Sequence, residues 1–117
     1  MRPLGVHHVS INVADTRASV DFYTNVLGLV QRTDRPDFSF DGAWLDLGDH
    51  QVHLLEIEVP TQTGQHFAMR VADLDAVVAE IRSHGVAVSE PRQVGPGRQA
   101  FLHDPSGNLV ELNEPIG

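Results

Sequence analysis

Two histidines and two glutamates occupy similar places in a sequence pattern that occurs twice. His8 and His66 are 58 positions apart, and each begins a stretch that reaches an aspartate seven positions later. Glu56 and Glu111 are 55 positions apart, and each lies in a strand-like apolar stretch near the end of its copy. Two imidazoles and two carboxylates form a plausible ligand set for a divalent cation. The residue types therefore predict a metal site.

The composition narrows the chemistry and the partners. The 117 residues contain no cysteine, and all eight basic residues are arginines, so thiolate and Schiff-base chemistry are excluded. A net charge of −8 without a basic cluster argues against binding to nucleic acid or to anionic membranes. The sequence shows no apolar run near the ~20 residues of a membrane helix and no signal-peptide pattern, which predicts a cytoplasmic protein.

In the first copy, a strand and a helix follow the histidine. Alternation predicts a strand over 6–13, and Asp15 caps a helix over 16–27 that ends at Gly28. Turn signals separate three further strands, expected near 29–33, 42–47 and 51–58.

The second copy repeats this order after a linker at 60–64. A strand begins at His66, a helix follows Asp73, and strands are expected near 86–89, 99–103 and 108–113. The order βαβββ, found twice, predicts an α+β fold: two modules, about 4–60 and 65–115, within one domain over 1–117. They are expected to form a curved mixed β-sheet with the helices on its outer face.

Side-chain alternation decides whether the four candidate ligands can meet. In each strand the candidate lies opposite the apolar, helix-facing set, so all four are expected on one side of the sheet. Leu54 and Val52 share the face of Glu56, which weakens its assignment. His53 has the opposite parity, and the choice between Glu56 and His53 stays open.

Four more residues are candidates to line a substrate cavity. Ser10 and Asn12 share the face of the first histidine, and Trp44 could form an aromatic wall. Arg70, like Arg98, could hold a substrate carboxylate. Each has an ordinary alternative role, because polar strand residues are usually solvated and an exposed Trp often packs at an interface.

Four stretches also carry the motifs of a known family: His8–Asp15, Phe22–Leu29, Gly42–Gly48 and Phe101–Glu111. Through them the chain resembles the vicinal oxygen chelate superfamily, which includes glyoxalase I, bleomycin-resistance proteins, fosfomycin-resistance enzymes and extradiol dioxygenases. The small glyoxalase I-like proteins are the branch that it resembles most.

The resemblance implies roles for the four candidates. Glyoxalase I binds its metal with two histidines and two glutamates, and the matching positions here are His8, Glu56, His66 and Glu111. The metal would be Ni²⁺, Co²⁺, Zn²⁺, Mn²⁺ or Fe²⁺, because a mixed nitrogen–oxygen shell does not select among them. The implied function is a metal-dependent lyase or isomerase, similar to lactoylglutathione lyase, acting on a small oxygen-chelating substrate. An enediolate-type intermediate would form, with Glu111 or Glu56 as general base.

Two other functions remain open. An extradiol-type Fe²⁺ dioxygenase would use His8, His66 and Glu111 alone, and a bleomycin-resistance-like protein would bind a ligand without catalysis. The resemblance also implies a homodimer in which His8 and Glu56 of one subunit meet His66 and Glu111 of the other. Pairing within one chain is the alternative. A small-molecule substrate is the other expected partner.

Overall fold

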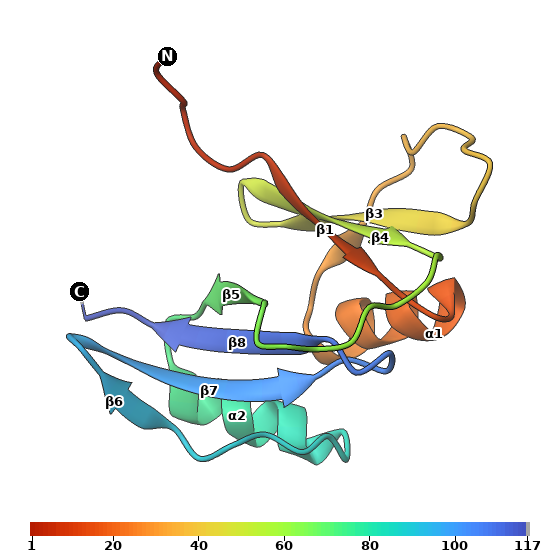
Figure 1. Ribbon diagram of the computed structural model, residues 1–117. Helices are drawn as coiled ribbons and strands as arrows, with labels where there is room; N and C mark the ends of the chain where they lie inside the picture. The colour runs from red at the N-terminus through yellow and green to blue at the C-terminus, as the bar shows by residue number, and fades with distance from the viewer. Residues whose placement is uncertain (117) are drawn as a thin grey trace. The chain divides into compact units, whose positions relative to one another are not determined.

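The computed structural model describes residues 1–116 and contains two compact units, one over Met1–Thr61 and a second that begins at Gln62 (Figure 1). In these residues, eight strands form two four-stranded sheets, one in each unit. The predicted α+β class and the doubled βαβββ order are confirmed, although the strands belong to two sheets and not to one.

The first unit pairs its strands in the order β1-β4-β3-β2. β1 runs parallel to β4, whereas β3 is antiparallel to both of its neighbours. The elements are β1 (His8–Asn12), α1 (Thr16–Asp21), η1 (Phe22–Val26), β2 (Val30–Gln31), β3 (Gly42–Leu47) and β4 (His50–Leu55). Thus β1 and β3 flank β4, and β4 presents its side chains between theirs.

The predicted first helix is divided into two parts. Asp15 caps α1, because its side chain accepts a hydrogen bond from the Ala18 N–H at 3.0 Å. The helix then widens into the π-helical turn η1, where the Leu27 N–H bonds the Phe22 carbonyl five residues earlier at 3.2 Å. The wider turn accompanies the burial of two consecutive aromatic residues, Phe22 and Tyr23.

The second unit has the strand order β5-β8-β7-β6, with β5 parallel to β8. Its elements are β5 (Phe67–Arg70), α2 (Leu74–Ser83), β6 (Arg92–Val94), β7 (Gly97–His103) and β8 (Leu109–Glu114). The strand expected near 86–89 is absent there, and β6 lies further along the chain. Val88 is buried, but its carbonyl accepts from the Arg82 side chain at 2.8 Å and not from a strand.

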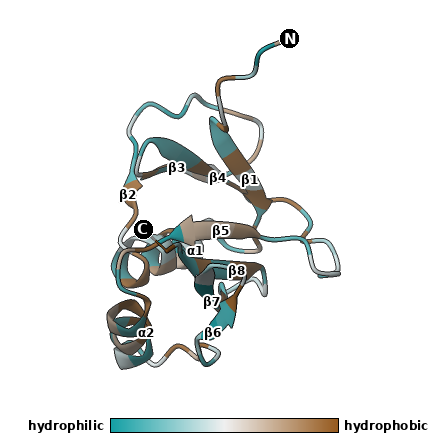
Figure 2. Ribbon diagram, turned by 90° about the vertical axis from the view of Figure 1, so that its left-hand side faces the viewer, coloured by the Kyte–Doolittle hydropathy of each residue, from teal (hydrophilic) through white to brown (hydrophobic). Residues whose placement is uncertain are grey.

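Each unit buries one face of its sheet against its own helix. α1 contacts β3 and β4, and α2 contacts β7 and β8. Apolar and polar residues alternate around α2 (Figure 2), as expected for a helix with one buried side. The strand residues buried in the two cores are Ala43, Leu45, Val52, Leu54, Met69, Ala100, Leu102, Val110 and Leu112. In residues 1–116 no helix has the length and apolar character needed to cross a membrane.

Candidate functional site

The first unit carries a row of stacked rings on the sheet face opposite α1. The register of β1, β4 and β3 places Ser10, His53 and Trp44 side by side. His8 stacks on His53, with 3.9 Å between ring centroids and 15° between planes, and Trp44 stacks on His53 at 4.4 Å and 10°. Because β1 and β3 flank β4, these two rings cover His53 from both sides. Only 8% of His53 is exposed.

His53 is prepared to act as a neutral ligand. Its Nε2 lies 2.8 Å from Gln51 Oε1, so an Nε2–H donates to the amide oxygen and the lone pair is on Nδ1. Burial lowers the pKa of His53 to about 4, and the neighbouring His8 and His7 lower it further in the same direction. The imidazole is therefore uncharged at neutral pH, as metal ligation requires.

His8 is exposed and has a hydrogen-bonding neighbour in the chain. The Nδ1 atoms of His7 and His8 lie 2.9 Å apart, so one of them donates to the other. When His8 is the donor, its Nε2 carries a lone pair that a cation can accept. His8 and His53 thus provide two nitrogen ligands within one unit.

The second unit holds an imidazole and a carboxylate in direct contact. His66 Nδ1 donates to the Gly64 carbonyl at 2.8 Å, while Nε2 faces Glu111 Oε1 at 3.0 Å. Asn113 Nδ2 donates to the other carboxylate oxygen at 3.0 Å. The Gly64 carbonyl, followed by Glu111, raises the pKa of His66. The proton on Nε2 occupies the place where a cation could bind both Nε2 and Oε1, with Gly64 and Asn113 orienting the two ligands.

Glu56 is engaged at a helix terminus. β4 ends at Leu55, so strand alternation does not extend to Glu56, and its expected place on the His8 face is wrong. Glu56 Oε1 accepts from the Thr16 N–H at 2.8 Å, at the start of α1. A carboxylate there satisfies an otherwise unpaired backbone donor and complements the helix dipole.

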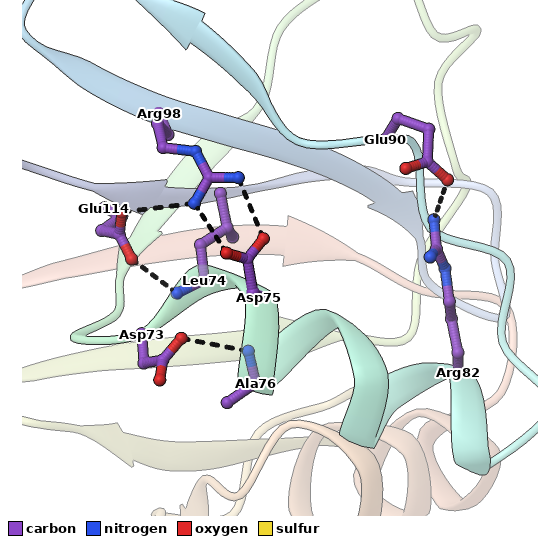
Figure 3. A network of polar contacts seen from close by, with 8 residues as sticks. All are labelled: Asp73, Leu74, Asp75, Ala76, Arg82, Glu90, Arg98 and Glu114. Atoms are coloured by element: carbon purple, nitrogen blue, oxygen red, sulfur yellow. Dashed lines mark hydrogen bonds and ion pairs between the residues drawn. The ribbon is translucent and has the colours of Figure 1, made fainter.

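The second unit repeats this helix contact 58 residues later. Glu114 Oε2 accepts from the Leu74 N–H at 2.7 Å, at the start of α2 (Figure 3). Glu56 therefore corresponds to Glu114, and the same spacing of 58 makes His53 the counterpart of Glu111. The spacing between the two histidines, applied to Glu111, is the sequence signal that identifies His53.

The four candidate lining residues have different surroundings. Ser10 lines a small cavity beside His53, and Trp44 forms one of its walls. Asn12 donates to the Glu58 carbonyl at 2.8 Å. Arg70 is exposed and lies beside Asn113 on the same sheet face as Glu111.

Arg98 takes part in a separate polar network. Its guanidinium group binds both carboxylate oxygens of Asp75 at 2.9 and 3.1 Å and lies 3.6 Å from Glu114 (Figure 3). Among residues 1–116, no three His, Cys, Asp or Glu side chains gather as a metal site. The candidate ligands described above instead form two pairs, one in each unit.

Comparison with known proteins decides the family. The sequence profile of the Glyoxalase/Bleomycin resistance protein/Dioxygenase superfamily matches residues 5–112. The chain belongs to this superfamily. The lactoylglutathione lyase of Escherichia coli O157:H7 is 30% identical, over 92% of this chain and 90% of its own length.

Two other superfamily relatives span almost the whole chain. The uncharacterized protein YaeR of Escherichia coli (strain K12) is 31% identical, over 93% of this chain and 95% of its own length. The crystal structure of TnmS3, an antibiotic binding protein from Streptomyces sp. CB03234, matches with a TM-score of 0.84 and 29% identity. That match covers 99% of both chains. The superfamily therefore includes relatives of this chain named as an enzyme and as a binding protein.

Proposed function

We propose that the protein is a metal-dependent lyase or isomerase of the glyoxalase I type, acting on a small substrate with two neighbouring oxygen atoms. The observation that supports this best is the His66–Glu111 pair, whose Nε2 and Oε1 lie 3.0 Å apart and are held by Gly64 and Asn113. The relatives named lactoylglutathione lyase support the reaction class. A cytoplasmic location stays a prediction from the sequence.

The proposed ligands are His8, His53, His66 and Glu111. The donor set fits a divalent cation, because His53 is neutral at neutral pH and Glu111 already faces a ring nitrogen. Ni²⁺, Co²⁺, Zn²⁺, Mn²⁺ and Fe²⁺ all suit this nitrogen-rich set. When bound, the cation would supply Lewis-acid stabilisation of negative charge on substrate oxygens.

Glu111 is the proposed proton carrier. It is the sole carboxylate of the set, and its Oε2 accepts from Asn113 while Oε1 is directed at His66. Exchange of the His66 contact for a substrate C–H would let Glu111 take a proton from one carbon and return it to the next. His66 would hold Oε1 in place between the two transfers.

Glu56 as a ligand or base stays a prediction. To serve either role, its carboxylate must give up the Thr16 N–H, a contact of 2.8 Å at the start of α1. The contact offers Glu56 a structural role, and substitution separates the two roles because only the ligand role affects metal content.

We also propose a homodimer in which the His8–His53 pair of one subunit and the His66–Glu111 pair of the other complete each site. Co-expression of a His8→Ala chain with a Glu111→Gln chain tests this. Across subunits, the mixed dimer regains one intact site, whereas each variant alone has none. A mixed dimer without metal would place both pairs of a site in one chain, and a monomer with full metal content would refute the dimer.

A second function has its own supporting observation. The stacked rings of His8, His53 and Trp44 border a cavity, and TnmS3 is named as an antibiotic binding protein. The chain would then hold an aromatic ligand without turnover.

Solvent-exchange measurements distinguish the two functions. The metal-loaded protein is incubated in deuterated water with a hemithioacetal of an α-ketoaldehyde, and the product is examined by NMR. An isomerase gives 2-hydroxy thioester product at a rate that Glu111→Gln lowers. Full metal loading without any turnover of hemithioacetals would favour the binding protein.

A further inference from the structure

A small cavity on the first unit is lined by flat ring faces. It has a volume of about 110 Å³ and lies beside His53, between Trp44 and the segment that contains Phe38 and Phe40. Trp44 stacks on His53 at 4.4 Å, Phe38 and Phe40 stack at 5.4 Å and 14°, and Phe38 lies 6.3 Å from Trp44. Sites for drug-sized ligands are usually about 300–1,000 Å³, so this cavity suits a single ring.

Arg35 adds a positive charge to this aromatic surface. Its guanidinium carbon lies 4.8 Å from the Phe38 ring centroid and 5.6 Å from that of Phe40. Nη2 donates to the Phe40 carbonyl at 2.9 Å. Gly42 permits this approach, because a Cβ there would lie 3.0 Å from Nη2.

The charge of Arg35 is not neutralised by an ion pair with any residue in the described range 1–116. Nearby carboxylates are already engaged by Arg32, which binds Asp34 at 2.7 Å and Asp46 at 2.8 Å. Arg35 therefore keeps donors for a planar anion, and guanidinium is well suited to carboxylate oxygens. In a chain of net charge −8, such a local cation is needed to attract an anion.

We propose that this cavity binds a planar aromatic ring that carries a carboxylate. The ring lies against Trp44 and the phenylalanines, and the carboxylate binds Arg35. His53 borders the cavity and also belongs to the proposed metal ligands, so the aromatic carboxylate is the substrate or ligand class of that same site. This assignment rests on the proposed function in that one respect; the cavity and Arg35 stand independently of the metal.

Intrinsic fluorescence provides a direct test, because Trp44 is the sole tryptophan of the chain. Metal-free protein is titrated with benzoate, with neutral benzamide and with non-planar cyclohexanecarboxylate. Benzoate should change the Trp44 emission in a saturable way and bind about tenfold more tightly than benzamide, since its charge-assisted bonds to Arg35 are lost in the amide. Cyclohexanecarboxylate should bind more weakly than benzoate, because it cannot stack.

Variants of Arg35 decide the role of its charge. Arg35→Gln should bind benzoate and benzamide equally, Arg35→Lys should keep part of the preference, and Arg17→Gln is the control distant from the rings. Circular dichroism confirms folding. Equal binding of benzoate and benzamide by the wild type, or a preference that survives Arg35→Gln, would overturn the proposal. Metal titration of the same proteins keeps this failure distinct, because Arg35→Gln should bind metal like the wild type.

Discussion

His53 and Glu111 occupy the same position in the two repeats, on β4 and β8, 58 residues apart. His53 lies beside Ser10 of the parallel strand β1, and Glu111 lies beside Ala68 of β5, which is the counterpart of Ser10. One repeat therefore presents an imidazole where the other presents a carboxylate. The proposed ligand set becomes three imidazoles and one carboxylate, which leaves Glu111 as its sole anionic ligand and base.

Removal of the Glu111 charge should affect both binding and turnover. Glu111→Gln should weaken metal binding by about tenfold or more, roughly 1.4 kcal/mol for each factor of ten. With metal restored at high concentration, proton transfer should still fall by about 10²–10⁴. Calorimetry and solvent-exchange NMR measure the two effects. Glu90→Gln is the control on an exposed carboxylate, and unchanged binding and turnover in Glu111→Gln would remove Glu111 from the site.

The two carboxylates at the helix termini should behave alike. Glu56→Gln and Glu114→Gln each remove a negative charge beside the first N–H groups of a helix, which should lower the free energy of unfolding by roughly 0.5 kcal/mol. Urea denaturation of the metal-free proteins measures this change. A loss for Glu114→Gln alone would show that the Thr16 contact contributes nothing to the stability of α1.

The low pKa of His53 should make the metal-free protein sensitive to acid. Its pKa is about 4 in the folded chain and near 6.5 when unfolded, so the unfolded state gains a proton first as the pH falls. The free energy of unfolding should decrease between about pH 6.5 and 4, by at most about 3 kcal/mol.

His53→Gln isolates this contribution. The raised pKa of His66 acts in the opposite sense, stabilising the fold at low pH and losing that effect as the pH rises through it. The wild type and His53→Gln share His66, so the difference between their stability curves reports His53 alone. Parallel curves over this range would contradict a depressed pKa.

Metal binding should have its own pH dependence. The cation must displace the proton that His66 holds between Nε2 and Glu111, and the raised pKa of His66 makes that proton harder to remove. Affinity should therefore fall as the pH decreases through the raised pKa, with release of a proton on binding. Calorimetry in buffers of different ionisation enthalpy counts the protons; binding without proton release at a pH below that pKa would count against the displacement.

Much of the fold follows from the sequence because the repeated pattern is strong. Alternation around His8, the caps Asp15 and Asp73, and the glycines after the helices predict the order of elements. The π-helical turn was not predictable from spacing, since Phe22, Tyr23 and the residues after them fit an ordinary helix equally well. The end of β4 was also hidden, because the apolar run continues past Leu55.

The site was predictable only in part, for a physical reason. An acidic residue in an apolar stretch signals a functional role equally well at a helix terminus and at a metal, and Glu56 was assigned to the second. The aromatic cavity was largely missed. Phe38 and Phe40 lie in an irregular segment, where no periodicity indicates which way a side chain points.

The choice between His53 and Glu56 is the most direct test of the metal site. Metal-free wild type, His53→Gln and Glu56→Gln are titrated with Co²⁺, and the visible absorption of the bound ion is followed together with the stoichiometry. We expect one Co²⁺ per chain for the wild type and for Glu56→Gln with the same spectrum, and an affinity lower by about tenfold or more for His53→Gln, with an altered spectrum. Wild-type binding by His53→Gln together with loss of binding by Glu56→Gln would contradict the proposed ligand set.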